Sequence, residues 1–324
     1  MIRRSVVGFL LVLAAMLALP AGQARAAFPD RPITLIVPWA AGGGTDAVAR
    51  MIGLMLEKEL GVPVNVVNRT GGSGVVGHQA IASAQPDGYT IGLITLEINM
   101  MHWVGLTKLT YEAYTPLALM NADPAAIHVR VDSPFPTLKE LLAFIKANPG
   151  KLKASGTGQG GSWHLALAGM LKSQDISPAT VPWVPSTGAA TALTDLAAAG
   201  VDFVSCSLPE ADALIRAGKI RSIALMADKR AKNFPDVPTL AEAAGSDWKK
   251  GVWRGMVGPK GLSPELAKRY EASLKKIYDS KEFQDFMNSR GFEAVWAEAP
   301  AFGAFMAKDN AEIGEILKEM GLAK

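Results

Sequence analysis

The chain has 324 residues, a formal net charge of +3 and one cysteine. Its first 26 residues predict an export signal: Arg3 and Arg4 precede fourteen uncharged residues, 6–19, and Ala24-Arg25-Ala26 has the A-x-A pattern of a cleavage site. Removing this signal leaves equal numbers of basic and acidic residues, which argues against nucleic acid or a membrane surface as partner. We therefore expect an exported protein whose signal is cleaved near Ala26.

The single cysteine and the few histidines argue against a disulfide-bonded protein and against a metalloprotein. Cys206 cannot form an intramolecular disulfide or a metal cluster by itself. The four histidines lack H-x-x-x-H or H-E-x-x-H spacing, so we predict no metal site. The remaining chain of about 298 residues exceeds the usual single core and predicts two domains.

The segment 33–50 predicts a strand, a glycine turn and a helix, and the rest of the chain is organised around it. Ile33–Val37 is a continuous apolar run, typical of a strand buried on both faces. The three glycines 42–44 let a ligand approach backbone N–H groups closely, and Thr45 or Asp46 can cap the helix that follows. Free N–H groups at that helix N-terminus favour an anion. The alternative is an ordinary turn without a ligand.

The rest of the chain alternates between predicted strands and helices. Strands are expected at 64–67, 89–95, 125–130, 201–205, 221–226 and 252–257. Helices are expected at 138–147, after the turn 155–162, at 188–196, and near 264–278, 282–288 and 301–320. The helix at 138–147 begins with a Thr137-x-x-Glu140 capping box and ends at Asn148-Pro149-Gly150. This alternation predicts an α/β fold in which mostly parallel sheets are flanked by helices. Ligands bind at the carboxyl ends of such strands, where the polar turns at 40–46, 71–77, 155–162, 186–188 and 205–209 fall.

Two enzymatic interpretations compete with a binding site. Residues 72–77 form a G-x-G-x-x-G between a strand and a helix, and Glu97 lies where a ribose-binding acid is expected, so an exported NAD(P)-type oxidoreductase is the alternative function. The export signal argues against it, and a tight turn with close packing explains the same glycines. Residues 160–164 begin like G-x-S-x-G but have His164 in place of the last glycine, so a serine hydrolase is not supported.

Three further residues need an interpretation. Trp163 is either a core residue or a ring that stacks over a ligand. Arg254 interrupts an apolar run and is either a member of a buried ion pair or a clamp for a ligand carboxylate. Cys206 is expected to be a small packed residue.

Five segments resemble the substrate-binding proteins of tripartite tricarboxylate transporters, also called the Bug (Bordetella uptake gene) family. They are FPDRPITLIVPWAAGGGTDAVAR, VNVVNRTGGSGVVGHQAIASAQPDGYTIGL, ASGTGQGGSWHLALAGML, GAATALTDLAAAGVDF and IRAGKIRSIALMADKRAKNFPDVPTLAEA. The resemblance runs from about Phe28 to the C-terminus. It implies a two-domain clamshell of the type II periplasmic-binding fold that is not an enzyme and needs no cofactor. Lobe 1 would comprise 27–124 and 229–324, and lobe 2 would comprise 125–228.

The resemblance also implies a small carboxylate ligand held between the lobes and delivered to the membrane components of the transporter by a monomer. The family's first loop corresponds to Pro38–Asp46 and its second-lobe turn to Ser155–Ser162. Many members have Asp-Asn where this chain has Cys206-Ser207. Citrate, a C4 dicarboxylate and an aromatic acid all fit. No catalytic residue is expected, and the candidate ligand-binding residues are Pro38, Ala41, Gly42, Gly43, Thr45, Asp46, Thr95, Ser155, Thr157, Gly158, Ser162, Trp163, Thr187, Ser207 and Arg254.

Overall fold

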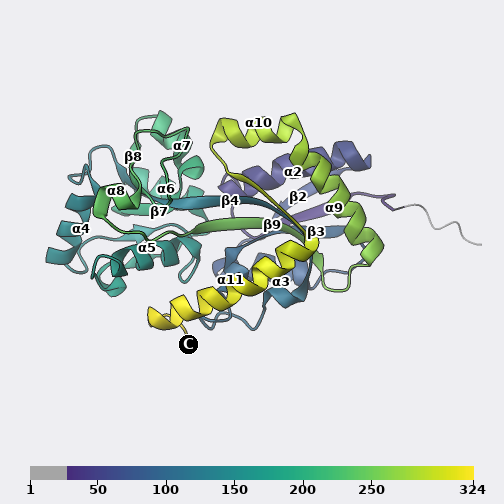
Figure 1. Ribbon diagram of the computed structural model, residues 1–324, viewed down its shortest axis with the longest axis horizontal. Coiled ribbons are helices and arrows are strands. Elements are labelled where there is room, and N and C mark those ends of the chain that lie inside the picture. Colours follow the sequence, from purple (N-terminus) through teal and green to yellow (C-terminus); the bar gives the residue numbers. More distant parts are fainter. Residues whose placement is uncertain (1–27) are drawn as a thin grey trace, which may run out of the picture. The chain divides into compact units, whose positions relative to one another are not determined.

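The structure is a computed structural model that describes residues 28–324. The predicted export signal and its cleavage site lie outside the described residues. Within them, no helix has the length and apolar character needed to cross a membrane. The fold described below is that of the compact unit Arg31–Lys324 (Figure 1).

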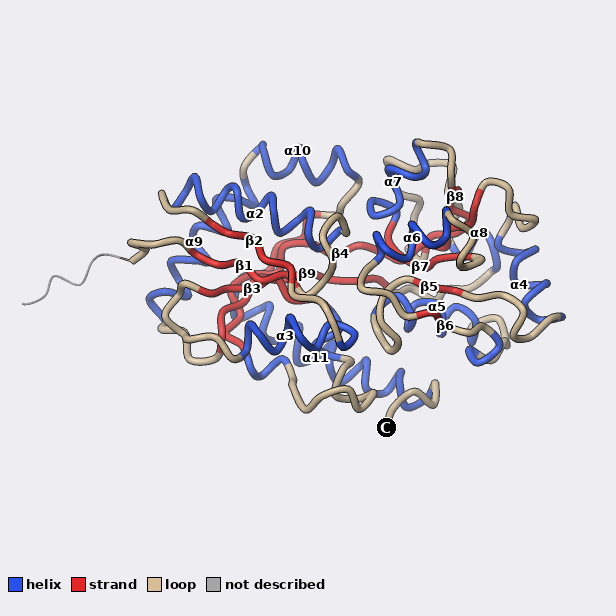
Figure 2. Tube along the Cα trace, turned by 180° about the vertical axis from the view of Figure 1, so that it is seen from behind, coloured by secondary structure: helices blue, strands red, loops and turns tan. Residues whose placement is uncertain are grey.

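Two β-sheets share the long strand β4 (Tyr114–Arg130). In sheet A the strand order is β2-β1-β3-β9-β4, and β10 pairs with the other side of β4. In sheet B the order is β8-β4-β7-β5-β6. The first part of β4, residues 114–124, pairs with β9, and residues 125–130 pair with β7 and β8. We call the elements around sheet A lobe 1 and those around sheet B lobe 2, and Figure 2 shows β4 running from one to the other.

The strands of lobe 1 besides β4 are β1 (Ile33–Val37), β2 (Val64–Asn68), β3 (Thr90–Thr95), β9 (Gly251–Pro259) and β10 (Ala294–Glu298). Those of lobe 2 are β5 (Ala154–Ser155), β6 (Trp183–Val184), β7 (Phe203–Ser207) and β8 (Ile220–Leu225). In both lobes three parallel strands lie in the order second, first, third along the chain: β2-β1-β3 and β6-β5-β7.

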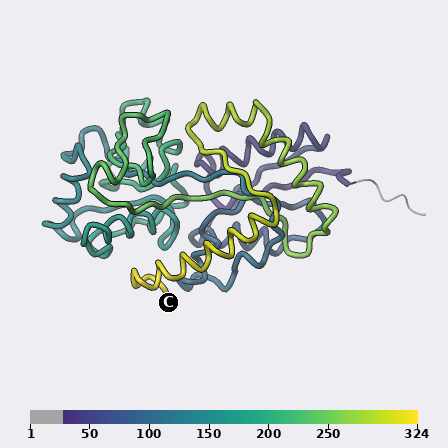
Figure 3. The backbone as a smooth tube through the Cα atoms, viewed as in Figure 1, coloured from purple at the N-terminus to yellow at the C-terminus, as the bar shows by residue number. Residues whose placement is uncertain are grey.

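Helices cover both faces of the sheets. Those of lobe 1 are α2 (Gly44–Leu60), α3 (Val75–Ala82), α9 (Pro264–Asp279), α10 (Lys281–Arg290) and α11 (Ala299–Glu319). The others are α4 (Leu138–Ala147), α5 (Ser162–Lys172), α6 (Ala189–Ala197), α7 (Leu208–Arg216) and α8 (Leu240–Ala244). Following the colours in Figure 3, the chain makes β1 to β3, passes through β4 into lobe 2, and returns to finish with α9, α10 and α11.

The α/β class and the alternating elements are confirmed, but the sheets are mixed, and mostly parallel sheets were a wrong prediction. Every pairing that involves β4, β9 or β10 is antiparallel. The reason is topological, since β4 and β9 run in opposite directions side by side and each sheet takes in at least one strand from this pair.

Local signals predicted several elements well. The strand at 33–37 and the helix at 138–147 have the predicted bounds, and α4 has the predicted capping box between Thr137 and Glu140. Helix α2 instead begins at Gly44, with Gly43 as its N-cap. Thr45 and Asp46 therefore lie inside the first turn, and the prediction that one of them caps the helix is wrong.

The glycine turn after β2 is a packing device. An added Cβ at Gly77 would lie 2.4 Å from the Pro38 Cα, and one at Gly74 would lie 3.0 Å from the Trp39 ring. The glycines thus let the start of α3 approach the loop after β1, which is the tight-turn explanation of residues 72–77.

Candidate functional site

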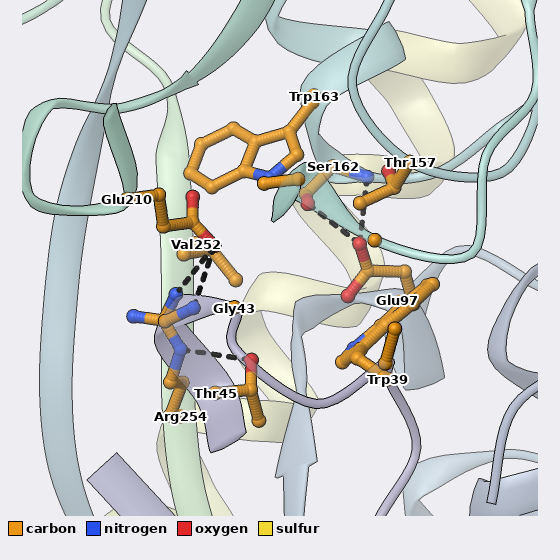
Figure 4. A pocket seen from close by; sticks show the side chains of 14 residues that line it. Trp39, Gly43, Thr45, Glu97, Thr157, Ser162, Trp163, Glu210, Val252 and Arg254 are labelled. Carbon is orange, nitrogen blue, oxygen red and sulfur yellow. Dashed lines mark hydrogen bonds and ion pairs between the residues drawn. The ribbon is translucent and has the colours of Figure 1, made fainter. Parts of the chain in front are cut away.

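A small cavity of about 20 Å³ lies where the N-termini of α2 and α5 come together (Figure 4). A space of that size holds about one water molecule. Its walls come from both lobes: the loop after β1 with the start of α2, Glu97 and β9 on one side, and Thr157, the start of α5, residues 188–189 and the start of α7 on the other. The lining residues are Trp39, Ala40, Gly43, Gly44, Thr45, Glu97, Thr157, Ser162, Trp163, Gly188, Ala189, Glu210, Val252 and Arg254.

The loop after β1 is held in shape by Asp46, which lies behind the cavity wall. The Asp46 carboxylate accepts hydrogen bonds of 2.9 Å from the Gly42 N–H, the Arg50 Nε and the Asn68 Nδ2. Burial raises the pKa of Asp46, but the bonds from Arg50, Gly42 and Asn68 outweigh it, so its pKa is lowered. An ionised Asp46 therefore keeps Gly42 in its left-handed conformation (φ 84°) and presents Gly43 and Gly44 to the cavity.

The loop before α5 offers the cavity a hydroxyl group without a partner. Thr157 is 5% exposed and lines the cavity, and its Oγ1 atom has no hydrogen bond within the described residues. Trp163 is 2% exposed and also lines the cavity. The core interpretation is confirmed, and stacking of its ring over a ligand stays a prediction. A buried hydroxyl without a partner costs free energy, so a water or a ligand group is expected to satisfy it.

Each lobe places a glutamate at the helix N-terminus of the other lobe. Glu97, directly after β3, accepts hydrogen bonds from the Ser162 N–H at 2.9 Å and the Ser162 Oγ at 2.5 Å. Glu210, in the first turn of α7, accepts from the Gly44 N–H at 3.2 Å. Both first turns thus bind a carboxylate, which is the chemistry that helix N-termini favour.

Glu210 also accepts hydrogen bonds from a residue of its own lobe. Its Oε2 atom accepts from the Ser207 N–H at 3.1 Å and the Ser207 Oγ at 3.0 Å, which makes the capping box of α7. Burial raises the pKa of Glu210, while Arg254 and the Ser207 hydrogen bonds act in the opposite direction. The carboxylate therefore lies in a site where its charge is only partly compensated.

Arg254 is a member of a buried ion pair. It is 1% exposed, and its Nη1 atom contacts the Asp123 carboxylate and the Asn121 side-chain oxygen. Its Nε atom donates to the Thr45 Oγ1 at 3.0 Å, and its Nη2 atom lies 3.5 Å from the Glu210 Oε1. The ion-pair interpretation is confirmed, and the guanidinium is also part of the cavity wall, so a contact with a ligand stays a prediction.

The structure brings six of the predicted ligand-binding residues to the cavity: Gly43, Thr45, Thr157, Ser162, Trp163 and Arg254. The other nine are not among the lining residues. Thr95 donates to Glu97 at 2.5 Å, Ser155 donates to the Val184 carbonyl, and the Thr187 carbonyl accepts from the Ala40 N–H. The remaining six are Pro38, Ala41, Gly42, Asp46, Gly158 and Ser207.

Sequence reasoning missed Glu210 as a site residue, and it considered Glu97 only as a ribose-binding acid. The signal for Glu210 was present, because Ser207-Leu208-Pro209-Glu210 has the S-x-x-E pattern of a capping box with proline at a position that suits a helix start. For Glu97, the carboxylate is bonded to Thr95 and Ser162. Neither glutamate could be placed near the opposite helix from local pattern alone.

The Ser162 hydroxyl and the His164 imidazole already have hydrogen-bond partners within the protein. Ser162 Oγ donates to Glu97, and His164 Nδ1 accepts from the Gly160 N–H at 3.1 Å. Burial lowers the pKa of His164 to about 4. Cys206 is fully buried, as predicted for a small packed residue. Ser162 and His164 therefore do not form a nucleophile–base pair.

Comparison with known proteins identifies relatives over nearly the whole chain. Residues 48–322 match the family described as tripartite tricarboxylate transporter family receptor. A UPF0065 protein of Bordetella pertussis (strain Tohama I) is 31% identical over 297 residues, which is 91% of each chain.

Three solved structures are also similar. A TctC solute binding protein from Polaromonas, without ligand, is 36% identical with a TM-score of 0.64 and covers 90% of this chain and 99% of its own. The periplasmic binding protein BugD is 30% identical with a TM-score of 0.86, covering 92% and 100%. MatC from Rhodopseudomonas palustris, with bound malate, is 25% identical with a TM-score of 0.81, covering 90% and 100%. The predicted two-domain clamshell fold of periplasmic binding proteins is therefore confirmed.

Proposed function

Because the chain belongs to the tripartite tricarboxylate transporter receptor family, we propose that it binds a small organic carboxylate between its lobes and delivers it to the membrane components of such a transporter. It does this as a monomer in the periplasm, after cleavage near Ala26, and without catalysis. The ligand is a di- or tricarboxylate or an aromatic acid. The malate named for MatC is a dicarboxylate, which supports this ligand class.

One observation carries the proposal: the first turns of α2 and α5 line the same cavity, and each binds a carboxylate through a backbone N–H. Two helix N-termini that meet at one point suit a small anion with more than one carboxylate. Because the donors are backbone groups, the site needs no buried lysine. Arg254, the one arginine in the lining, has its charge compensated by Asp123.

The size of the cavity indicates that ligand entry requires movement of the lobes. About 20 Å³ accommodates roughly one water molecule, not an organic acid. The fold is also more similar to malate-bound MatC than to the ligand-free Polaromonas protein, although the latter is more identical in sequence. Both observations support a closed arrangement of the lobes here, which opens to admit the ligand.

Movement of the lobes requires two places where the chain passes from one lobe to the other. We propose that the first passage between lobes lies at 124–125, as expected from the resemblance, because β4 pairs with β9 up to Pro124 and with β7 from Ala125. For the second passage, we propose a position between α8 and β9, later than the expected 229, because α8 contacts α4 and β8 in lobe 2. Hinge motion would then occur in β4 and in the segment 245–251.

Calorimetric titration with malate, adipate, citrate, benzoate and a neutral diamide tests the function. We expect at least one acid to bind and the diamide not to bind. Gly43→Val should abolish binding but leave the fold intact, since an added Cβ meets only the Ala40 carbonyl at 3.6 Å while adding bulk to the cavity wall. Gly200→Val is the matched control, with its Cβ 3.4 Å from the Asp195 carbonyl and away from the lining residues.

Two outcomes would contradict the proposal. Wild-type affinity in a folded Gly43→Val protein would place the ligand elsewhere. A melting shift with NAD or NADP and none with any acid would instead favour the oxidoreductase alternative.

A further inference from the structure

The two glutamates that close the cavity occupy the N–H groups that a ligand would need. Glu97 belongs to lobe 1 and binds the start of α5 in lobe 2, while Glu210 belongs to lobe 2 and binds the start of α2 in lobe 1. These contacts join residues 65 and 166 positions apart in the chain. They are therefore reciprocal bridges between the lobes.

Both bridges are buried and well supported. Glu97 is 1% exposed and accepts three hydrogen bonds, from the Ser162 N–H, the Ser162 Oγ and the Thr95 Oγ1. The Glu210 side chain is 5% exposed, and besides Gly44 and Ser207 it lies 3.5 Å from an Arg254 nitrogen. Charge-assisted hydrogen bonds of this kind are about twice as strong as neutral ones.

The charges in the cavity wall make it unfavourable for the glutamates and an anionic ligand to remain there together. The wall contains two carboxylates and one guanidinium, and that guanidinium is paired with Asp123 behind it. A dianion enclosed with both carboxylates would meet like charges in a space with almost no water. The unpartnered Thr157 hydroxyl in the same wall provides a donor that neither glutamate uses.

Building on the proposed function, we propose that the ligand is a dicarboxylate whose two carboxylates replace Glu97 at α5 and Glu210 at α2. The two glutamates are thus built-in competitors that hold the lobes together when no ligand is bound. Opening of the lobes breaks the contacts of Glu97 with Ser162 and of Glu210 with Gly44, which exposes both N-termini, while each glutamate keeps its partners within its own lobe. The apparent affinity is then the intrinsic affinity reduced by the fraction of molecules that are open.

The test compares Glu97→Gln, Glu210→Gln and the double variant with wild type by calorimetric titration of malate and adipate. Glutamine keeps the shape and can still accept a hydrogen bond, but it lacks the charge that makes the glutamate a strong competitor. We expect each single variant to bind the diacid about tenfold more tightly, which corresponds to about 1.4 kcal/mol. The matched control is Glu140→Gln, since Glu140 also sits in a capping box, in α4, and does not line the cavity.

A second measurement reports lobe opening without ligand. Small-angle scattering should give the unliganded double variant a larger radius of gyration than wild type, and added diacid should reduce it to the wild-type value. Affinity that falls in the glutamine variants would overturn the inference, because the glutamates would then be contacts of the bound ligand. Affinity equal to that of Glu140→Gln would overturn it too. If no acid binds wild type or any variant, the proposed function itself fails.

Discussion

Removal of the Arg254 guanidinium should destabilise the fold strongly. Arg254→Ala eliminates contacts to Thr45, Asn121 and Asp123 and leaves two buried carboxylates, Asp123 and Glu210, without their cation. Asp123 is 1% exposed and the Glu210 side chain 5%, so water cannot compensate for either. Breaking a buried ion pair from one side costs about 3–5 kcal/mol.

Urea unfolding at pH 7, followed by tryptophan fluorescence, measures this loss. The matched control is Arg216→Ala, because Arg216 pairs with Asp212 at 2.8 Å but is 68% exposed. Exposed pairs contribute only about 0–1 kcal/mol. Replacing two of the partners, as in Arg254→Met with Asp123→Leu, should recover the part of the loss that comes from Asp123, while Glu210 still lacks its cation.

The same variant separates the two roles of Arg254. If it acts as an internal ion pair, Arg254→Ala should weaken mono- and dicarboxylates to the same extent. A fully stable Arg254→Ala protein that loses only dicarboxylate binding would refute this reasoning and assign the guanidinium to the ligand. Unfolding free energies of Arg254→Ala and Arg216→Ala within about 0.5 kcal/mol of each other would refute the stated burial cost.

Gly77→Ala should lower the unfolding free energy by about 1–3 kcal/mol, because its Cβ would lie 2.4 Å from Pro38 Cα; a full-stability variant would contradict the packing role of the turn. His128 is fully buried, and burial lowers its pKa to about 4, so it stabilises the fold above pH 6.5 and this contribution is lost as the pH falls toward 4. The unfolding free energy should fall by about 3 kcal/mol over this pH range, as measured by urea unfolding at a series of pH values. A His128→Gln variant whose unfolding free energy depends on pH as in wild type would disprove this. Thr137→Ala removes the capping box with Glu140 and should cost about 0.5–2 kcal/mol in thermal unfolding, whereas an unchanged melting temperature would show that tertiary packing alone holds α4.

The elements that local sequence predicted are those whose signals lie within a few consecutive residues. The apolar run Ile33–Val37 was sufficient to predict β1. The capping box Thr137-x-x-Glu140 and the helix-breaking residues Asn148-Pro149-Gly150 were sufficient to predict α4. A continuous apolar run indicates a strand buried on both faces, and a capping box indicates a helix start. Both signals lie within one short segment, so that segment alone carries the information. The family resemblance then extended these local elements to a complete two-lobed fold.

Elements with conflicting local signals were missed. The first half of β4, residues 114–124, contains Pro116 and Pro124, and proline is unusual inside a strand, so the local sequence does not indicate a strand there. It is a strand because β9 and β10 pair with it from either side. Helix α7 was not predicted, and its first two residues were assigned to the turn 205–209, although proline is well tolerated in the first turn of a helix.

The sequence by itself predicted that the glycine-rich turns at 42–44 and 155–162 lead into helices, and that the first of these helix N-termini favours an anion. Only the tertiary structure decided that the N-termini of α2 and α5 line one cavity, and that Glu97 and Glu210 already bind there. These glutamates reach donors 65 and 166 residues away, across the boundary between lobes. No periodicity or capping pattern specifies such a contact, because it depends on how two separately packed sheets are joined through β4.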